Sequence, residues 1–279
     1  GGKNMLTLGF ESSAKAASAA LVRDGRLVAG FYAGRTHFII SCSDCMLGPD
    51  ENRDILKLIL GFMEESGTAP YDEVTHTGTV RHILIRQGRH TGELMVCLVI
   101  NADGMKQAEQ LGERLQQAFP ALRSFSLCVN RERTNVIMGT RLINVLGPGY
   151  IEEEIREGGL SPVRFRISPL SFFQVNPVQT ERLYEKALEY AGLTGQENVW
   201  DLYCGTGTIS LFLAREAARV RGVEIVPPAI ENARENARLN GIENAEFLVG
   251  RSEEIFPAYC AQHPEEVPDV VVLDPPLGE

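Results

Sequence analysis

The stretch Val199-Trp-Asp-Leu-Tyr-Cys-Gly-Thr-Gly-Thr-Ile-Ser-Leu-Phe-Leu-Ala214 decides the fold of this chain. A short apolar run ends in Asp201, passes through Gly205 and Gly207, and opens into an apolar-periodic segment. This order is typical of a strand, a tight glycine turn and a helix, because glycine adopts positive φ values and lets a ligand approach the backbone closely. We expect the helix to start near Thr208, with its free N–H groups facing the space above the turn.

A second predicted strand, from Ala218 to Glu224, follows the helix and also ends in an acid. In a nucleotide-binding βαβ unit, an acid about 20 residues beyond the glycine turn binds ribose hydroxyls, which makes Glu224 a candidate for that role. The turn reads D-x-x-x-G-x-G and lacks the lysine of a triphosphate loop. Its acidic strand end suits a cationic or amino-bearing ligand. S-adenosylmethionine, with a sulfonium and an α-amino group, is the natural candidate, and Asp274-Pro-Pro276 at another predicted strand end favours the same interpretation.

The segment that begins at residue 198 predicts a doubly wound α/β arrangement. Its expected strands are 198–203, 219–224, 245–249 and 269–273, and its expected helices are 208–217, 228–240 and 252–257. Four strands form only the first part of a methyltransferase sheet, so we expect an incomplete sheet whose fourth strand lies at an edge. The abrupt end after Asp274-Pro-Pro-Leu-Gly-Glu279 predicts that the chain is a fragment.

The preceding half of the chain is predicted to be rich in β-structure. A helix between Asp50 and Glu65, with Asp50 as its cap, precedes a β-β-α-β unit made of a hairpin over 81–101, a helix over 105–118 and a strand over 122–130. The expected domains are therefore an N-terminal hairpin at 1–29, a β-rich α+β central domain at 30–160 and a cofactor-binding domain at 161–279.

A loop from Phe165 to Pro177 leads into a helix expected at 178–191. Gln174 and Asn176 stand in this apolar-aromatic loop, just before the nucleotide-type fold. A polar amide in this place is a candidate ligand contact, but it equally suits a helix cap or a partner for backbone groups. Both interpretations stay open at the level of sequence.

Composition places the chain among ordinary globular proteins. It has 279 residues, 44% of them hydrophobic and 23% charged, which indicates about two domains. No apolar run approaches about 18 residues and no signal peptide opens the sequence. We therefore expect a cytoplasmic protein without a membrane segment, monomeric, with its six cysteines as thiols.

The net charge of −10 argues against wholesale coating of nucleic acid. Residues 151–279 carry 11 basic and 22 acidic side chains, whereas residues 81–141 carry nine basic and five acidic ones. Any polyanion would accordingly bind the N-terminal half. The basic side chains there either contact phosphates or form a solvated edge that discourages strand association; they include Arg81, Arg86, Arg89, Arg131 and Arg133.

Two smaller patterns have a structural and a functional interpretation. Cys42 and Cys45 form a lone C-x-x-C, and the remaining cysteines do not form a second pair, so a metal site is disfavoured. Residues 5–28, with a predicted hairpin turn at Asp24-Gly25, resemble the first hairpin of actin-like ATPase-fold proteins of the tRNA threonylcarbamoyladenosine-synthesis type. We interpret this segment as a structural hairpin or as a join between unrelated coding segments.

Residues from about 26 to 276 resemble the RNA (uracil-5-)-methyltransferase family, nearer its 23S ribosomal RNA branch than its tRNA branch. The motifs that carry the resemblance are Gly30-Phe-Tyr-Ala-Gly-Arg-Thr-His37, Arg89-His-Thr-Gly-Glu-Leu-Met-Val96, Asn130-Arg-Glu-Arg-Thr-Asn-Val-Ile-Met-Gly139, Ser171-Phe-Phe-Gln-Val-Asn-Pro-Val-Gln-Thr180, Asp201-Leu-Tyr-Cys-Gly-Thr-Gly207 and Asp274-Pro-Pro276. The resemblance implies a class I Rossmann-like methyltransferase sheet, an RNA substrate and 5-methyluridine as product, with a role in rRNA processing.

The resemblance also implies contacts to S-adenosylmethionine by Gln174, Tyr203, Glu224 and Asp274, with the Gly205/Gly207 turn beneath the methionine moiety. In this family a cysteine thiolate adds to uracil C6 and a base later removes the C5 proton. Both residues follow Asp-Pro-Pro in the family, so their positions fall beyond Glu279, and no cysteine of the chain takes their place. Cys45 resembles one ligand of the family's iron–sulfur cluster, but its partners are missing. These points predict weak or absent cofactor binding and no turnover by this chain.

Two rival functions remain open. Asp-Pro-Pro also serves amino-methylating enzymes, usually with an aromatic residue next, where this chain has Leu277. Alternatively, the chain is a non-catalytic fragment that binds RNA or cofactor. Analysis of the methylated base distinguishes the first rival, and salt-dependent RNA binding without methyl transfer would favour the second.

Overall fold

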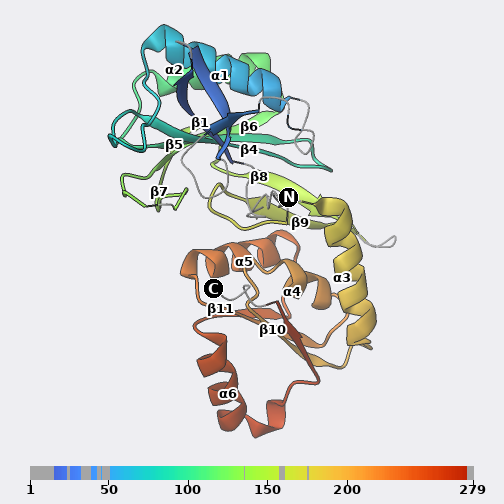
Figure 1. Cartoon of the computed structure of the whole chain (residues 1–279). Helices are drawn as coiled ribbons and strands as arrows, with labels where there is room; N and C mark the ends of the chain where they lie inside the picture. The colour runs from blue at the N-terminus through green and yellow to red at the C-terminus, as the bar shows by residue number, and fades with distance from the viewer. Residues whose placement is uncertain are drawn as a thin grey trace, which may run out of the picture. The chain divides into compact units, whose positions relative to one another are not determined.

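The computed structural model of the chain describes residues 16–23, 26–32, 39–42, 45, 51–134, 136–156, 161–174 and 176–274. These residues form two compact units (Figure 1). The first unit comprises the described residues up to Gly88, Gly92–Ile151 and Ser168–Leu170. The second comprises Arg89–Thr91, Glu152–Ile167 and the described residues from Ser171 onward.

The first unit is built on a seven-stranded sheet with the order β3-β2-β1-β4-β5-β6-β7. The strands are β1 (Ala16–Arg23), β2 (Arg26–Tyr32), β3 (Ile39–Ser41), β4 (Val80–Gln87), β5 (Leu94–Ile100), β6 (Leu122–Val129) and β7 (Arg141–Leu146). The predicted N-terminal hairpin is part of this sheet from Ala16 onward, because β1 pairs antiparallel with both β2 and β4. Residues 5–15 and the turn at 24–25 lie outside the described residues.

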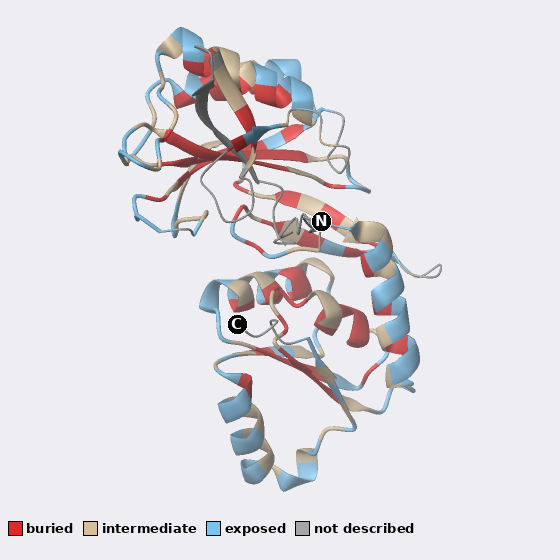
Figure 2. Cartoon of the chain, in the orientation of Figure 1, coloured by how far each residue is buried: buried red, intermediate tan, exposed pale blue. Residues whose placement is uncertain are grey.

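Two amphipathic helices complete the core of the first unit. Helix α1 (Asn52–Ser66) and helix α2 (Ala108–Ala118) contribute Ile55, Ile59 and Leu111 to one cluster with the apolar side chains of the sheet. Every residue of β5 is buried, because this strand lies between β4 and β6 and one of its faces is under the helices (Figure 2). The predicted β-β-α-β unit is present as β4, β5, α2 and β6, with β5 and β6 parallel.

The second unit contains a four-stranded parallel sheet with the order β12-β11-β10-β13. Its strands are β10 (Asn198–Leu202), β11 (Arg219–Glu224), β12 (Ala245–Val249) and β13 (Val270–Leu273). When these four strands are numbered along the chain, their order across the sheet is 3-2-1-4. This is the doubly wound order, in which the direction of strand addition reverses between the first and fourth strands. Such sheets bind ligands beyond the carboxyl ends of the strands at this reversal.

The helices of the second unit lie on both faces of its sheet (Figure 1). Helices α3 (Pro177–Ala191), α4 (Thr208–Leu213) and α5 (Pro227–Leu239) are on one side, and α6 (Ser252–Gln262) and the short 3-10 helix η1 (Pro264–Glu266) are on the other. Under α6, the Trp200 ring packs edge-on against Phe256 and Tyr259, each with a centroid distance of 5.1 Å. On the α4 side, Phe212 packs against Tyr184 of α3 at 5.4 Å.

A separate two-stranded ladder, β8 (Ile151–Ile155) with β9 (Val163–Ile167), precedes α3. Its residues alternate between buried and more exposed positions, as expected for strands with one covered face. From Glu152 onward, both strands belong to the second unit, whereas the sequence placed the domain boundary near residue 160.

The predicted helix at 208–217 ends early, at Leu213. The Ala214 N–H still bonds four residues back, but the N–H groups of Arg215 and Glu216 bond to carbonyls three residues back, which tightens the chain out of the α-helix. Asn244 supplies the side-chain partner at this end, because its Nδ2 donates to the carbonyls of Ala214 at 2.6 Å and Ala217 at 3.0 Å. A contact from 27 or 30 residues away fixes this helix end, so local periodicity could not reveal it.

Candidate cofactor site

The glycine turn after β10 has the backbone conformation that its sequence predicts. Gly205 and Gly207 have φ values of 56° and 80°, and Tyr203, which is not glycine, has a φ of 71°. A Cβ atom on Gly205 would meet nothing within 4 Å, whereas one on Gly207 would lie 3.0 Å from Ala233 and Phe247. Gly207 therefore allows close packing of the turn on α5 and β12, and Gly205 leaves open space where a ligand can approach.

Glu224 holds this turn with its carboxylate. Its Oε2 accepts the Gly205 N–H at 3.2 Å, and its Oε1 accepts the Val226 N–H at 3.0 Å. An ionised carboxylate offers about four acceptor positions, so each oxygen keeps capacity for a further donor. The side chain is half-buried at the carboxyl end of β11. A hydroxyl-bearing ligand above the turn would find an acceptor already fixed in place.

Three of the sequence-predicted residues lie at the same level of the sheet. Leu202 of β10 pairs in register with Val223 of β11 and with Leu273 of β13. The residues that follow these three are Tyr203, Glu224 and Asp274. Because the strands are parallel and adjacent, these three residues lie at neighbouring positions along the carboxyl edge of the sheet. The sequence alone predicted strand ends but could not give this common register.

Tyr203 is held by the first turn of α6. Its hydroxyl donates to the Glu253 carboxylate, which raises the pKa of the tyrosine and lowers the pKa of Glu253. Its backbone N–H bonds to the Val223 carbonyl at 2.9 Å. A residue other than glycine in the left-handed region is strained, and such strain gathers at functional sites. Glu253 was not predicted from the sequence, because a glutamate in a first helical turn ordinarily serves only the helix dipole.

Asp201 has a different place from the one that its position in the turn motif suggested. Its side chain is fully buried and accepts a hydrogen bond from the Ser210 hydroxyl at 2.5 Å. Burial raises its pKa to about 7, and the Asp274 and Glu224 carboxylates add to that rise. Its Oδ1 is buried without a hydrogen-bond partner among the described residues. Asp201 therefore holds Ser210 of α4 from inside the core, and its buried side chain does not lie at an exposed strand end.

The loop that carries Gln174 is fixed at both ends within the second unit. Before Gln174, the Ser171 hydroxyl accepts from Asn232 Nδ2 of α5 at 3.1 Å. After it, Asn176 is the N-cap of α3 and accepts the Gln179 N–H at 3.2 Å, so the cap interpretation of Asn176 is confirmed. Gln174 itself is half-buried between these two points. Its contact with a ligand remains a prediction.

Two apolar side chains next to Glu224 were not predicted from the sequence to be part of the site. Ile225 and Val226 are exposed, with 57% and 49% of their surface accessible. Branched apolar side chains at the rim of a polar site offer a surface for a flat ring, which suits a purine. Sequence could not single them out, because an apolar pair after a strand is ordinarily buried.

Two arginines of the basic cluster predicted from the sequence are used inside the fold. Arg81 is buried and donates to the carbonyls of Asn130 at 3.0 Å and Glu132 at 2.8 Å. Arg86 donates to the Ser168 carbonyl at 2.9 Å, and burial lowers its pKa to about 10. Arg81 and Arg86 thus shape loops, and neither forms the solvated edge or phosphate contact considered from the sequence. Arg89 and Arg133 are exposed, and phosphate contact by either residue remains a prediction.

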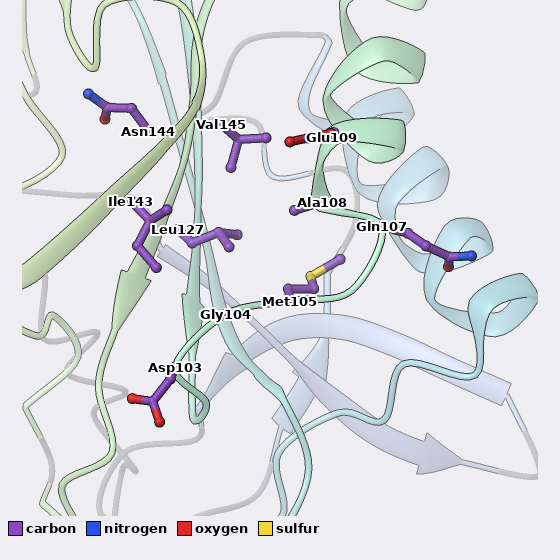
Figure 3. A pocket seen from close by; sticks show the side chains of 10 residues that line it. All are labelled: Asp103, Gly104, Met105, Gln107, Ala108, Glu109, Leu127, Ile143, Asn144 and Val145. Carbon is purple, nitrogen blue, oxygen red and sulfur yellow. The ribbon is translucent and has the colours of Figure 1, made fainter.

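The first unit also has a hollow of about 440 Å³ between the start of α2 and strands β6 and β7 (Figure 3). Its walls combine apolar side chains such as Leu127 and Ile143 with polar ones such as Asp103. Asp103 is engaged by Arg131 at 2.9 Å and by Arg141 at 3.3 Å. The hollow contains no residue predicted to act in catalysis or binding.

Within the described ranges, no group of three or more histidine, cysteine, aspartate or glutamate side chains could hold a metal ion. Cys45 is half-buried. Cys204, in the glycine turn, is buried, and burial raises the pKa of its thiol well above the ordinary value. No helix in the part of the chain that the structure describes has the length and apolar character to cross a membrane.

Comparisons with known proteins agree with this geometry. A family model described as a methyltransferase domain matches residues 193–276. An uncharacterized RNA methyltransferase of Halalkalibacterium halodurans is 46% identical over 254 residues, which are 91% of this chain and 54% of the relative. Another from Clostridium acetobutylicum is 45% identical over 252 residues, which are 90% of this chain and 53% of that relative. The chain spans about half the length of these curated relatives.

Among solved structures, the Pyrococcus abyssi tRNA (uracil-54, C5)-methyltransferase in complex with S-adenosyl-L-homocysteine is similar to this chain with a TM-score of 0.73. The two are 25% identical, and the match covers 95% of this chain and 60% of that one. With the 3-2-1-4 strand order, these similarities show that the second unit has the Rossmann-like methyltransferase fold.

Proposed function

We propose that this chain carries the S-adenosylmethionine site of an RNA methyltransferase that makes 5-methyluridine. The observation that carries the proposal is the common register of Tyr203, Glu224 and Asp274 beside the open glycine turn. The relatives named RNA methyltransferases and the solved structure with bound S-adenosylhomocysteine support it.

The residues of the site suit the parts of this cofactor. Glu224 has free acceptor capacity for the ribose hydroxyls, and Ile225 offers an apolar surface to the adenine ring. The turn at Gly205 and Gly207 lies beneath the methionine moiety in this proposal, with Tyr203, Asp274 and Gln174 as further contacts. When bound, the sulfonium supplies an electrophilic methyl group. The carboxylates of Glu224 and Asp274 suit a ligand that carries positive charge.

Uracil C5 methylation needs a nucleophile that adds to C6, and in the resembling family this is a cysteine thiolate. Cys204 is unsuited to that task, because burial raises its pKa and so keeps the thiol protonated. The proposal therefore assigns cofactor binding, and not uracil activation, to the described residues, and it expects no turnover by this chain alone. Cofactor binding itself is expected to be measurable, in contrast to the prediction from sequence, because the four strands bring the site residues together.

The proposal also covers which class of RNA is methylated, and it favours 23S ribosomal RNA over tRNA. The motif resemblance favours 23S ribosomal RNA, whereas the solved structure quoted above is a tRNA enzyme. A cytoplasmic monomer is part of the same proposal.

Deleting the coding sequence in the source organism tests the product and the RNA class together. Nucleosides from purified 23S rRNA and from purified tRNA would be quantified by mass spectrometry, and reintroduction of the gene provides the control. The expected result is loss of 5-methyluridine from 23S rRNA. Loss from tRNA would move the substrate to tRNA. Loss of an N-methylated base with unchanged 5-methyluridine would contradict the uracil assignment.

A further inference from the structure

Helix α5 has asparagines at positions 232 and 236, and Asn240 is its C-cap residue; their spacing of four places them on one face of the helix. Asn240 Oδ1 accepts the Arg164 N–H at 2.8 Å, and its Nδ2 donates to the Arg164 carbonyl at 2.7 Å. One turn earlier, Asn236 Oδ1 accepts the Arg166 N–H at 2.9 Å. The side chains of α5 thus bond the edge of β9 that β8 does not cover.

The match between helix and strand follows from their dimensions. Four residues of α-helix advance about 6.0 Å, and two residues of strand advance about 6.6 Å. N–H groups two residues apart point to the same edge of a strand, so asparagines four apart can bond them in succession. Arg164 and Arg166 are spaced in this way along β9. The asparagines therefore supply hydrogen-bond partners to the backbone of β9 in place of a neighbouring strand.

Asn236 differs from Asn240 in its second contact. Its Nδ2 donates to the Thr206 carbonyl at 3.3 Å, and Thr206 lies between the two glycines of the turn. Asn236 is completely buried, so both halves of its amide depend on these partners. Asn232, on the same helix face, donates a hydrogen bond to the hydroxyl of Ser171, where the loop toward Gln174 begins.

We propose that Asn236 is a positioning residue of the cofactor site, which ties the glycine turn to the strand that leads to the Gln174 loop. This inference rests on the proposed cofactor function. Through one amide, the Thr206 carbonyl and the Arg166 N–H are kept at a fixed separation. The turn and the Gln174 loop, which approach a cofactor from different parts of the sequence, therefore keep one geometry.

The test compares Asn236→Asp with Asn240→Asp in the full 279-residue chain. Each aspartate can still accept the β9 N–H, and all measurements are made well above neutral pH, where a carboxyl whose pKa is raised by burial is ionised and can no longer donate. Only Asn236→Asp loses a bond to the cofactor turn. S-adenosylhomocysteine affinity is measured by calorimetry, and exchange of the 203–208 backbone amides is measured by hydrogen–deuterium exchange without ligand. Asn236→Ala, whose small side chain places no charge in the core, serves if Asn236→Asp does not fold.

We expect Asn236→Asp to weaken S-adenosylhomocysteine binding about tenfold and to speed exchange at 203–208. Asn240→Asp should stay within about twofold of the unmodified chain in affinity and leave this exchange unchanged. Equal effects of both variants, or no effect of Asn236→Asp, would overturn the inference. If the unmodified chain binds no S-adenosylhomocysteine, the proposed function fails. The exchange comparison then decides separately whether Asn236 holds the turn.

Discussion

Replacing Glu224 with alanine removes the acceptor that we assign to the ribose of the cofactor. In the structure this carboxylate already bonds the N–H groups of Gly205 and Val226, at 3.2 and 3.0 Å. The substitution therefore has two consequences. The free protein loses a support of the glycine turn, and the complex loses the bonds to ribose hydroxyls.

The size of each effect follows from hydrogen-bond energies. A hydrogen bond to a charged group contributes roughly 1.5–3 kcal/mol, so loss of the ribose contacts should weaken S-adenosylhomocysteine binding about 100-fold. The backbone contacts lie at a half-buried position, and their loss should lower the free energy of unfolding by about 1–2 kcal/mol. Urea unfolding followed by circular dichroism measures the second effect without ligand.

A cycle with a modified ligand separates the two effects. Calorimetry compares S-adenosylhomocysteine with its 2′-deoxyribose analogue, on the unmodified chain and on Glu224→Ala. On the unmodified chain, removal of the ribose hydroxyl should cost at least about tenfold in affinity. On the variant it should cost less than about twofold. If both proteins lose the same factor, Glu224 does not bind this hydroxyl and the assignment is wrong.

Three further predictions concern the surroundings of the site. The difference in unfolding free energy between Asp201→Asn and the unmodified chain should shift in favour of the variant by at least about 1 kcal/mol as pH rises from about 4 to about 7. The reason is that the pKa of Asp201 is raised to about 7 in the folded protein, so the unmodified chain loses stability over that range. A difference that does not vary with pH would contradict this prediction. Gly222→Ala should lower the free energy of unfolding by about 1–3 kcal/mol, because its Cβ would lie 2.7 Å from the Phe247 ring. Gly61→Ala, whose Cβ would meet nothing within 4 Å, should not destabilise the protein. Urea titration of both variants checks the contrast. Tyr203→Gly should change the free energy of unfolding by less than about 1 kcal/mol, because relief of the left-handed backbone strain offsets the lost ring contacts. It should nevertheless weaken S-adenosylhomocysteine binding at least about tenfold. Unchanged affinity would refute a ligand role for this ring.

Much of the second unit could be predicted from sequence because its signals are local. Apolar runs that end in an acid, followed by glycines and a periodic segment, specify β10, the turn and α4 without knowledge of distant residues. The same holds for Glu224, whose distance along the chain from the turn is typical of a ribose-binding acid. Where strand ends and turns decide the site, the sequence shows them directly.

What sequence missed depends on partners far along the chain. The asparagines of α5 look like an ordinary polar helix face, and only β9, about 70 residues earlier, shows what Asn236 and Asn240 bond. Arg81 was considered for phosphate contact, but its guanidinium serves carbonyls about 50 residues later. Asp201 was interpreted by its place in the motif, while burial, a property of the whole fold, sets its pKa. Contacts between remote segments leave no local pattern to find.

The central claim, that the second unit holds a site for S-adenosylmethionine, is tested most directly by titrating S-adenosylhomocysteine into the purified, unmodified chain by calorimetry. Circular dichroism and a cooperative urea transition establish beforehand that the protein is folded. The account predicts saturable binding of one ligand per chain, with competition by S-adenosylmethionine. No binding by a chain shown to be folded would contradict it.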